Sequence, residues 1–105
     1  MSTQSTPKRA DIFSALELST SNVSEETALW LGEAVEQNSY PGIAIYGKAE
    51  YGWFVHVPEE VEPGELEKIP TDLYGVLMYA KALGCRLVMF DMDAEPNADL
   101  PEFDW

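Results

Sequence analysis

The stretch TDLYGVLMYAKALGCRLVMF, residues 71–90, carries the strongest structural signal in the sequence. Its apolar side chains recur at positions i, i+3, i+4, i+7 and i+10, and they are Leu73, Val76, Leu77, Ala80 and Leu83. This spacing predicts an amphipathic helix with one buried face, on which Leu77 is expected to be fully buried. Thr71 or Asp72 is the expected N-cap, and Gly84 is expected to end the helix. The apolar run 86–90 then predicts the last strand of a sheet.

Upstream of this stretch, the sequence predicts a β-hairpin. Aromatic and β-branched residues are concentrated at 43–46 and 53–57, and a glycine-bounded loop, 47–52, separates them. His56, the single histidine, falls inside the second of these strands, and we interpret it as structural.

The first part of the chain is predicted to contain one more strand and one more helix. Residues 11–18 form the expected strand, and helical spacing of apolar residues continues over 25–38. Asn22 or Ser24 is the expected cap of that helix. Residues 1–10 are polar and predict a disordered leader, so that 11–105 would form a single acidic domain with an acidic C-terminal tail.

The predicted order of elements is therefore β-α-β-β-α-β, which indicates an α+β fold. Two crossover helices and one hairpin can build a two-layer sandwich with both helices on one face of the sheet. We favour the ferredoxin-like split arrangement, and other two-layer arrangements remain open.

Charge is the most unusual property of the sequence. Nineteen acidic residues face six basic residues among 105, and the formal net charge is -13. Direct binding to nucleic acid or to an anionic membrane is disfavoured, because each would meet like charge, whereas a basic partner is favoured. Solubility alone would explain a modest excess of acids, but an imbalance this large costs self-repulsion and favours a second reason. The only cysteine, Cys85, excludes an internal disulfide and is expected to be buried. Without a signal core or a long apolar run, the sequence predicts a cytoplasmic protein.

Two motifs suggest chemistry, and neither is complete. Asp91-Met92-Asp93 follows the last predicted strand, as in phosphotransferases with an aspartate nucleophile, but no lysine follows it. Acids and one amide also occupy positions 1, 3, 5, 7, 9 and 12 of a calcium-loop count, at Asp91, Asp93, Glu95, Asn97, Asp99 and Glu102. Pro96 stands where that loop requires glycine, so we expect no tightly bound metal. Since the sequence contains no complete catalytic set, we also expect no cofactor and no enzymatic activity.

The candidate binding residues fall into three sets. The first comprises the acids of the 58–70 loop and of the tail: Glu59, Glu60, Glu62, Glu65, Glu67, Asp91, Asp93, Glu95, Asp99, Glu102 and Asp104. A second candidate face lies on the first helix, with Glu25, Glu26, Glu33 and Glu36. The third set, Tyr74 and Met78, lies off the inward stripe of the second helix and could form an apolar interface, including that of a homodimer.

Three stretches carry a family resemblance: residues 18–31, the hairpin YGKAEYGWFVHV, and GCRLVMFDMDAE together with the final LPEFDW. They resemble a largely uncharacterised family of small acidic proteins encoded on bacterial plasmids, integrative elements and prophages. The resemblance implies no catalytic residue. By analogy with other small acidic proteins of mobile elements, it implies an anti-CRISPR or antirestriction inhibitor that presents carboxylates to a basic nucleic-acid-binding protein or complex. The alternative is a non-inhibitory interaction or dimerisation module that uses the apolar face of the second helix.

Overall fold

The computed structural model describes residues 12–37, 43–60 and 68–105. The predicted leader, residues 1–10, lies outside them. The elements are β2 (Ala15–Ser19), the short 3-10 helix η1 (Thr20–Asn22), α1 (Glu25–Gln37), β3 (Ile45–Lys48), β4 (Gly52–His56), α3 (Thr71–Ala82) and β5 (Leu87–Asp91). The predicted α+β class and the order β-α-β-β-α-β are confirmed, with boundaries that differ by a few residues.

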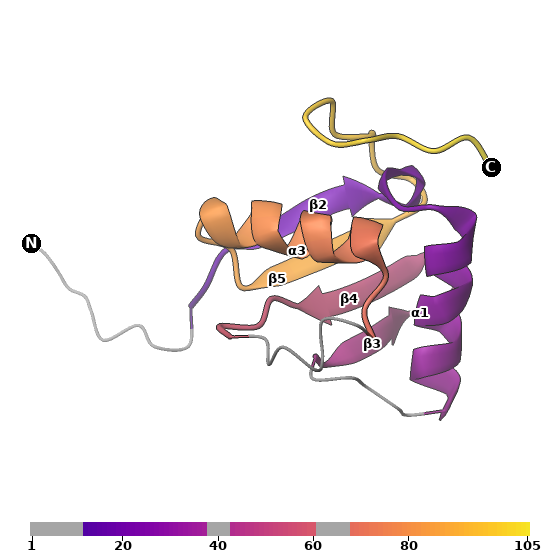
Figure 1. The fold of residues 1–105 in the computed structure, drawn as a ribbon, viewed down its shortest axis with the longest axis horizontal. Coiled ribbons are helices and arrows are strands. Elements are labelled where there is room, and N and C mark those ends of the chain that lie inside the picture. Colours follow the sequence, from indigo (N-terminus) through magenta and orange to yellow (C-terminus); the bar gives the residue numbers. More distant parts are fainter. Residues whose placement is uncertain (1–11, 38–42, 61–67) are drawn as a thin grey trace, which may run out of the picture.

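The four strands form one mixed sheet in the order β2-β5-β4-β3 (Figure 1). β2 pairs in parallel with β5, and the other neighbours are antiparallel. The ferredoxin-like arrangement was therefore wrong, because that fold places its first strand inside a fully antiparallel sheet. Here the apolar β5 takes a central position, where both neighbours shield it, and β2, which exposes Ala15 and Glu17, takes an edge.

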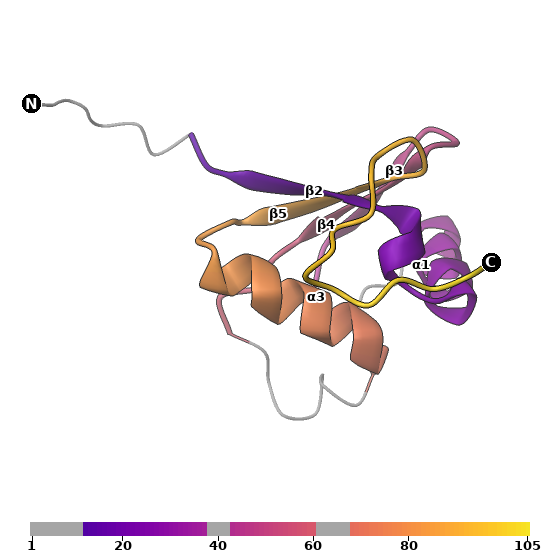
Figure 2. The same ribbon diagram turned by 90° about the horizontal axis from the view of Figure 1, so that it is seen from above.

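Both helices lie on the same side of the sheet (Figure 2), so the predicted two-layer architecture is confirmed. The strands turn alternate residues toward the helices, as Val88 and Phe90 of β5 show, and Leu18 lies opposite Phe90 in the register. α3 contributes Leu73, Val76, Leu77 and Ala80 of the predicted stripe, and Leu77 is 0% exposed as expected. The assignment of Leu83 to this stripe was wrong, because Leu83 lies just after the end of α3 and is 55% exposed. Cys85 is half-buried against this core rather than fully buried. Neither α-helix of the described part has the length and apolar composition of a membrane span.

The start of α1 agrees with one of the two predicted caps, whereas the start of α3 differs from the prediction. Ser24 caps α1, since its hydroxyl accepts the N–H of Thr27 at 3.2 Å. α3 starts after Pro70 without a side-chain cap, so the assignment of Thr71 or Asp72 as cap was wrong. The Asp72 carboxylate instead accepts hydrogen bonds from the start of the other helix, namely from the N–H of the capping residue Ser24 at 2.8 Å and from the hydroxyl of Thr27 in α1 at 2.5 Å. Asp72 thereby joins the N-terminal ends of both helices.

The hairpin turn is tighter than predicted, because β3 continues to Lys48 and β4 begins at Gly52. Ala49 adopts a left-handed backbone with a φ of 50°, and the N–H of Tyr51 donates to the carbonyl of Lys48 at 2.9 Å. A side chain at Gly52 would overlap the carbonyl oxygen of Phe90 on β5. Glycine at this position therefore permits the close approach of β4 to β5.

Candidate partner-binding surfaces

The acidic C-terminal segment, residues 92–105, is held against η1 by Asn22. This asparagine is 1% exposed, and its amide N–H groups donate to the carbonyls of Asn97 at 3.3 Å and Pro101 at 2.9 Å. Its carbonyl oxygen accepts the N–H of Asn97 at 2.9 Å. The buried amide is thus fully engaged, and its function is to anchor the segment rather than to cap α1.

The end of the segment lies beside the start of α1. The N–H of Phe103 donates to the carbonyl of Ser21 at 2.7 Å, and the indole N–H of Trp105 donates to the carbonyl of Val23 at 2.9 Å. Figure 1 shows the C-terminus at the same end of the molecule as α1. The structure therefore brings the last acids of the segment close to the acidic first turn of α1, which the sequence treated as a separate face.

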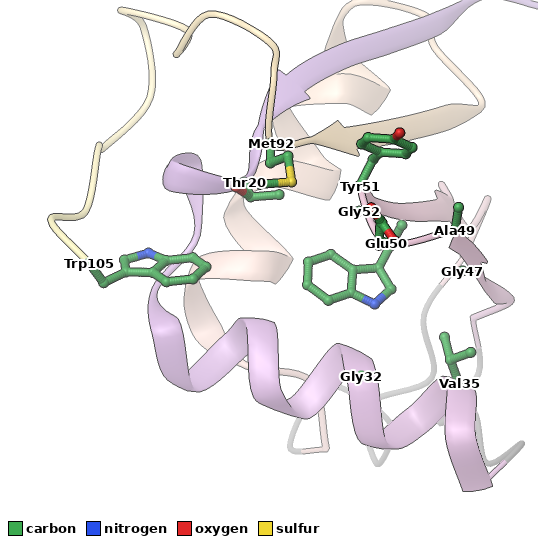
Figure 3. Close-up of a pocket in the computed structure, with 11 residues that line it drawn as sticks. Thr20, Gly32, Val35, Gly47, Ala49, Glu50, Tyr51, Gly52, Met92 and Trp105 are labelled. Atoms are coloured by element: carbon green, nitrogen blue, oxygen red, sulfur yellow. The ribbon is translucent and has the colours of Figure 1, made fainter.

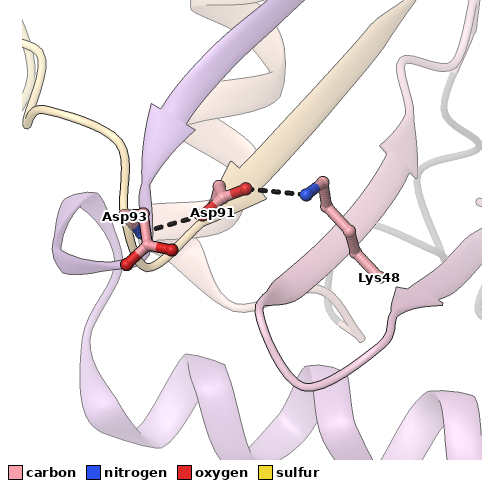
Figure 4. Close-up of polar contacts among 3 residues, drawn as sticks. All are labelled: Lys48, Asp91 and Asp93. Atoms are coloured by element: carbon pink, nitrogen blue, oxygen red, sulfur yellow. Dashed lines mark hydrogen bonds and ion pairs between the residues drawn. The ribbon is translucent and has the colours of Figure 1, made fainter.

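Asp91 is engaged within the fold. Its carboxylate forms an ion pair with the Lys48 ammonium at 2.7 Å and accepts the N–H of Asp93 at 2.8 Å (Figure 4). The hydrogen bond to Lys48 and the N–H of Asp93 hold the pKa of Asp91 below its usual value. The same hydrogen bond to Asp91 raises the pKa of Lys48. The pair joins the end of β3 to the end of β5, so this acid is not freely available to a partner.

The other acids predicted for partner binding are distributed over two ends of the molecule. Five of the C-terminal segment are exposed: Asp93, Glu95, Asp99, Glu102 and Asp104. Asp99 also accepts the hydroxyl of Tyr79 at 3.1 Å. Glu59 and Glu60 are exposed after β4, at the end of the sheet away from α1 (Figure 1). Glu62, Glu65 and Glu67 lie outside the described residues.

The predicted second face on α1 is exposed, and it borders a groove that the sequence analysis missed. Glu25, Glu26, Glu33 and Glu36 are all exposed. Between α1 and the β3–β4 hairpin lies a hollow of about 430 Å³, which Gly32 borders from α1 and Trp105 from the C-terminal segment (Figure 3). A hollow of about 460 Å³ adjoins it over α1 and shares Gly32, Trp53 and Trp105. No sequence motif marks this groove, because its walls come from three segments far apart along the chain.

The apolar candidate residues of α3 are less accessible than the acids. Tyr74 and Met78 are both half-buried and pack against the core. Among the residues that the structure describes, no group of three or more metal-ligating side chains is close enough to hold an ion. His56 is exposed on β4 and makes an edge contact with Tyr46, with ring centroids 5.9 Å apart.

These features define a small α+β domain with a four-stranded mixed sheet, helices on one face and a strongly anionic surface. The chain belongs to the family described as "Family of unknown function (DUF5983) C-terminal domain", whose model matches residues 15–105. The match spans every helix and strand among the residues that the structure describes. Comparisons with curated proteins and with solved structures gave no match.

Proposed function

We propose that this protein is a non-catalytic inhibitor, encoded on a mobile element, that occupies a basic nucleic-acid-binding surface of a host defence protein. The expected targets are restriction or CRISPR components, which carry Lys and Arg to meet phosphates. Carboxylates on a folded scaffold would compete with nucleic acid for those cations. The family resemblance supports the mobile-element setting by analogy alone.

The observation that carries this proposal is the lack of internal compensation for the acids. Among residues 12–37, 43–60 and 68–105, the single ion pair joins Lys48 and Asp91. Two other cations also contact the fold itself: Lys81 donates to the carbonyl of Glu59, and the Arg86 guanidinium lies 5.2 Å from the ring centroid of Phe13. The exposed acids of α1 and of the C-terminal segment therefore face solvent with no cation partner in the described part of the chain.

The arrangement of these acids also supports the proposal. The C-terminal segment is held by hydrogen bonds to the buried Asn22, and α1 is a regular helix, so both sets of carboxylates are presented on ordered backbone. Pre-organised charges lose little conformational freedom on binding, which favours association. Their long-range field would also speed the encounter with a basic surface.

The test is to capture partners from host lysate at low salt, identify them by mass spectrometry, and titrate the purified partner. We expect DNA or RNA to compete for binding, and the affinity to fall by orders of magnitude between about 50 and 200 mM salt. Replacing Asp93, Glu95 and Glu102 together by Lys should weaken binding strongly without unfolding the protein, since all three are exposed. A second set, Glu59 and Glu60 to Lys, tests the opposite end of the sheet.

Salt-insensitive binding without competition from nucleic acid would contradict the proposal. If binding then depended on Tyr74 or Met78, the interaction module that uses the apolar face of α3 would take its place. Single acid-to-amide changes at the rim are not decisive, because each is expected to alter affinity by at most about 1 kcal/mol.

A further inference from the structure

We infer that the groove between α1 and the β3–β4 hairpin is the docking site for an arginine-bearing segment of the partner protein. The inference rests on the proposed function, because it states how a basic partner would be recognised. It concerns the two adjoining hollows that share Gly32, Trp53 and Trp105, which we call the tryptophan groove.

The size and the walls of the tryptophan groove suit an inserted side chain. Its two hollows, about 430 and 460 Å³, each fall within the range of about 300–1,000 Å³ that is typical of ligand pockets. Val35 of α1 and the hairpin residues Gly47 and Trp53 border the first hollow. Figure 3 shows Trp105 at one end of this hollow and Val35 at the other.

Both tryptophans are held in place before any partner binds. Trp53 packs partly against the hydrophobic core. The indole of Trp105 is fixed by its hydrogen bond to Val23, yet 51% of this residue is exposed. Tryptophan presents the most favourable aromatic face for a cation, and a pre-ordered ring loses little freedom on binding. An exposed, fixed indole beside a hollow is therefore suited to cation–π recognition.

The charges around the groove select a cation as the occupant. Glu25, Glu33 and Glu36 border the second hollow and Glu50 borders the first, while none of the described residues that line either hollow is basic. Arginine fits this combination better than lysine, because its planar guanidinium stacks on aromatic rings and pairs bidentately with carboxylates. Leu29, which is 66% exposed on α1, offers apolar surface for the methylene groups of the same side chain.

Gly32 provides a direct way to block the groove. A Cβ at this position would meet no atom within 4 Å, so a larger side chain can project into the hollow without a clash at its first carbon. Gly32→Phe should therefore fill the groove, while Gly32→Ala leaves it open. Thermal melting of both variants checks that the fold is retained.

The experiment is calorimetric titration with arginine and lysine hexapeptides at about 50 mM salt, where electrostatic attraction is strong. We expect the arginine peptide to bind the parent more tightly than the lysine peptide. Gly32→Phe should weaken arginine-peptide binding about tenfold, or about 1.4 kcal/mol, which is within the range of a desolvated cation–π contact. Gly32→Ala should change it less than about twofold.

Two double variants that each remove two charges distinguish the contribution of the groove from that of the overall negative charge. Glu33→Gln with Glu36→Gln removes two charges beside the groove, and Glu59→Gln with Glu60→Gln removes two at the opposite end of the sheet. The first pair should weaken arginine-peptide binding more than the second.

If the two pairs weaken arginine-peptide binding equally and Gly32→Phe does not change it, the groove is not the docking site. The proposed function would then remain, with binding through diffuse charge attraction. Equal affinity for both peptides would overturn the selection of arginine. Conversely, suppose that peptide binding depends on the groove as expected while nucleic acid fails to displace the captured partner. That result would refute the proposed function and leave the inference about the groove intact.

Discussion

At the scale of single residues, Asn22 connects η1 to the C-terminal segment through three hydrogen bonds from one buried amide. Asn22→Ala would remove these hydrogen-bond partners from the backbone groups of Asn97 and Pro101 and would leave a cavity at a buried position. We therefore expect the free energy of unfolding in urea to fall by about 1–3 kcal/mol. Glu102→Ala is the control, since Glu102 is exposed on the same segment and should stay within about 0.5 kcal/mol of the parent. Hydrogen exchange at the Asn97 amide should accelerate only in the Asn22 variant, and unchanged protection there would contradict the anchoring role.

Asp72 gives a prediction on pH. Burial acts to raise its pKa, but hydrogen bonds from Ser24, Thr27 and Leu73 outweigh burial and hold the pKa below the ordinary 3.8. A lowered folded-state pKa adds stability that is fully present above the unfolded-state pKa of about 3.9 and is lost as pH falls through the folded-state value. The parent should therefore be more stable than Asp72→Asn at neutral pH, and this difference should shrink as pH falls below about 4.

The matched control for this measurement is Asp104→Asn, which removes an equal charge from an exposed position. Comparing the two variants separates the hydrogen bonds of Asp72 from the general loss of negative charge in acid. A difference between the Asp72 variant and the parent that stays constant from neutral pH to pH below 3 would refute the linkage.

At the scale of elements, two glycines have opposite surroundings: Gly52 packs closely against a neighbouring strand, and Gly75 lies on an open helix surface. Gly52→Ala places a methyl group against the Phe90 carbonyl, so β4 and β5 must separate, and we expect a loss of about 1–3 kcal/mol or more. Gly75 lies on the exposed face of α3, where a Cβ meets nothing within 4 Å. Gly75→Ala should stabilise the protein by about 0.5–1 kcal/mol. Melting curves that rank the two variants in the reverse order would refute this assignment.

Substitutions in and just after α3 test which residues form the core. Leu77 is 0% exposed, and Leu77→Ala should cost about 2–5 kcal/mol through lost burial and the cavity left behind. The control is Leu83→Ala, because Leu83 follows α3 and is 55% exposed. Chemical unfolding monitored by circular dichroism measures both. A melting temperature of Leu77→Ala within a degree or two of the parent would contradict its placement.

The sequence predicted the elements well because their signals are local. The apolar spacing of residues 73–83 and the glycine at 84 define α3 without reference to the rest of the chain. Strand order was not predictable in this way, since β2 and β5 pair across nearly the whole domain. The functions of Asn22 and Asp72 were missed for the same reason: their hydrogen-bond partners lie 45 to 79 residues away. A short polar residue before a helix resembles a cap, and only tertiary contacts distinguish an anchor from a cap.

At the scale of the whole molecule, the net charge of -13 should destabilise the compact state through self-repulsion. Added salt screens this repulsion, so the melting temperature should rise as ionic strength increases from about 10 to 150 mM. The exposed acids at Glu25, Glu33 and Glu36 contribute to this field. Sodium chloride and potassium chloride should act alike, since the effect requires only screening. A melting temperature that falls with salt would show that attractive pairs dominate instead.

The central position of β5 has a consequence for how the chain folds. β5 is hydrogen-bonded to both β2 and β4, and β2 has no other strand neighbour in the described part of the structure. During synthesis, the chain emerges from its N-terminus, so β2 must wait until residues 87–91 have left the ribosome before it can pair. Such long-range pairing is slow because a large loop must close before any contact compensates for its lost entropy. The sheet of this small domain therefore completes itself late, and a ribosome that pauses before residue 87 holds a nascent chain whose first strand is still unpaired.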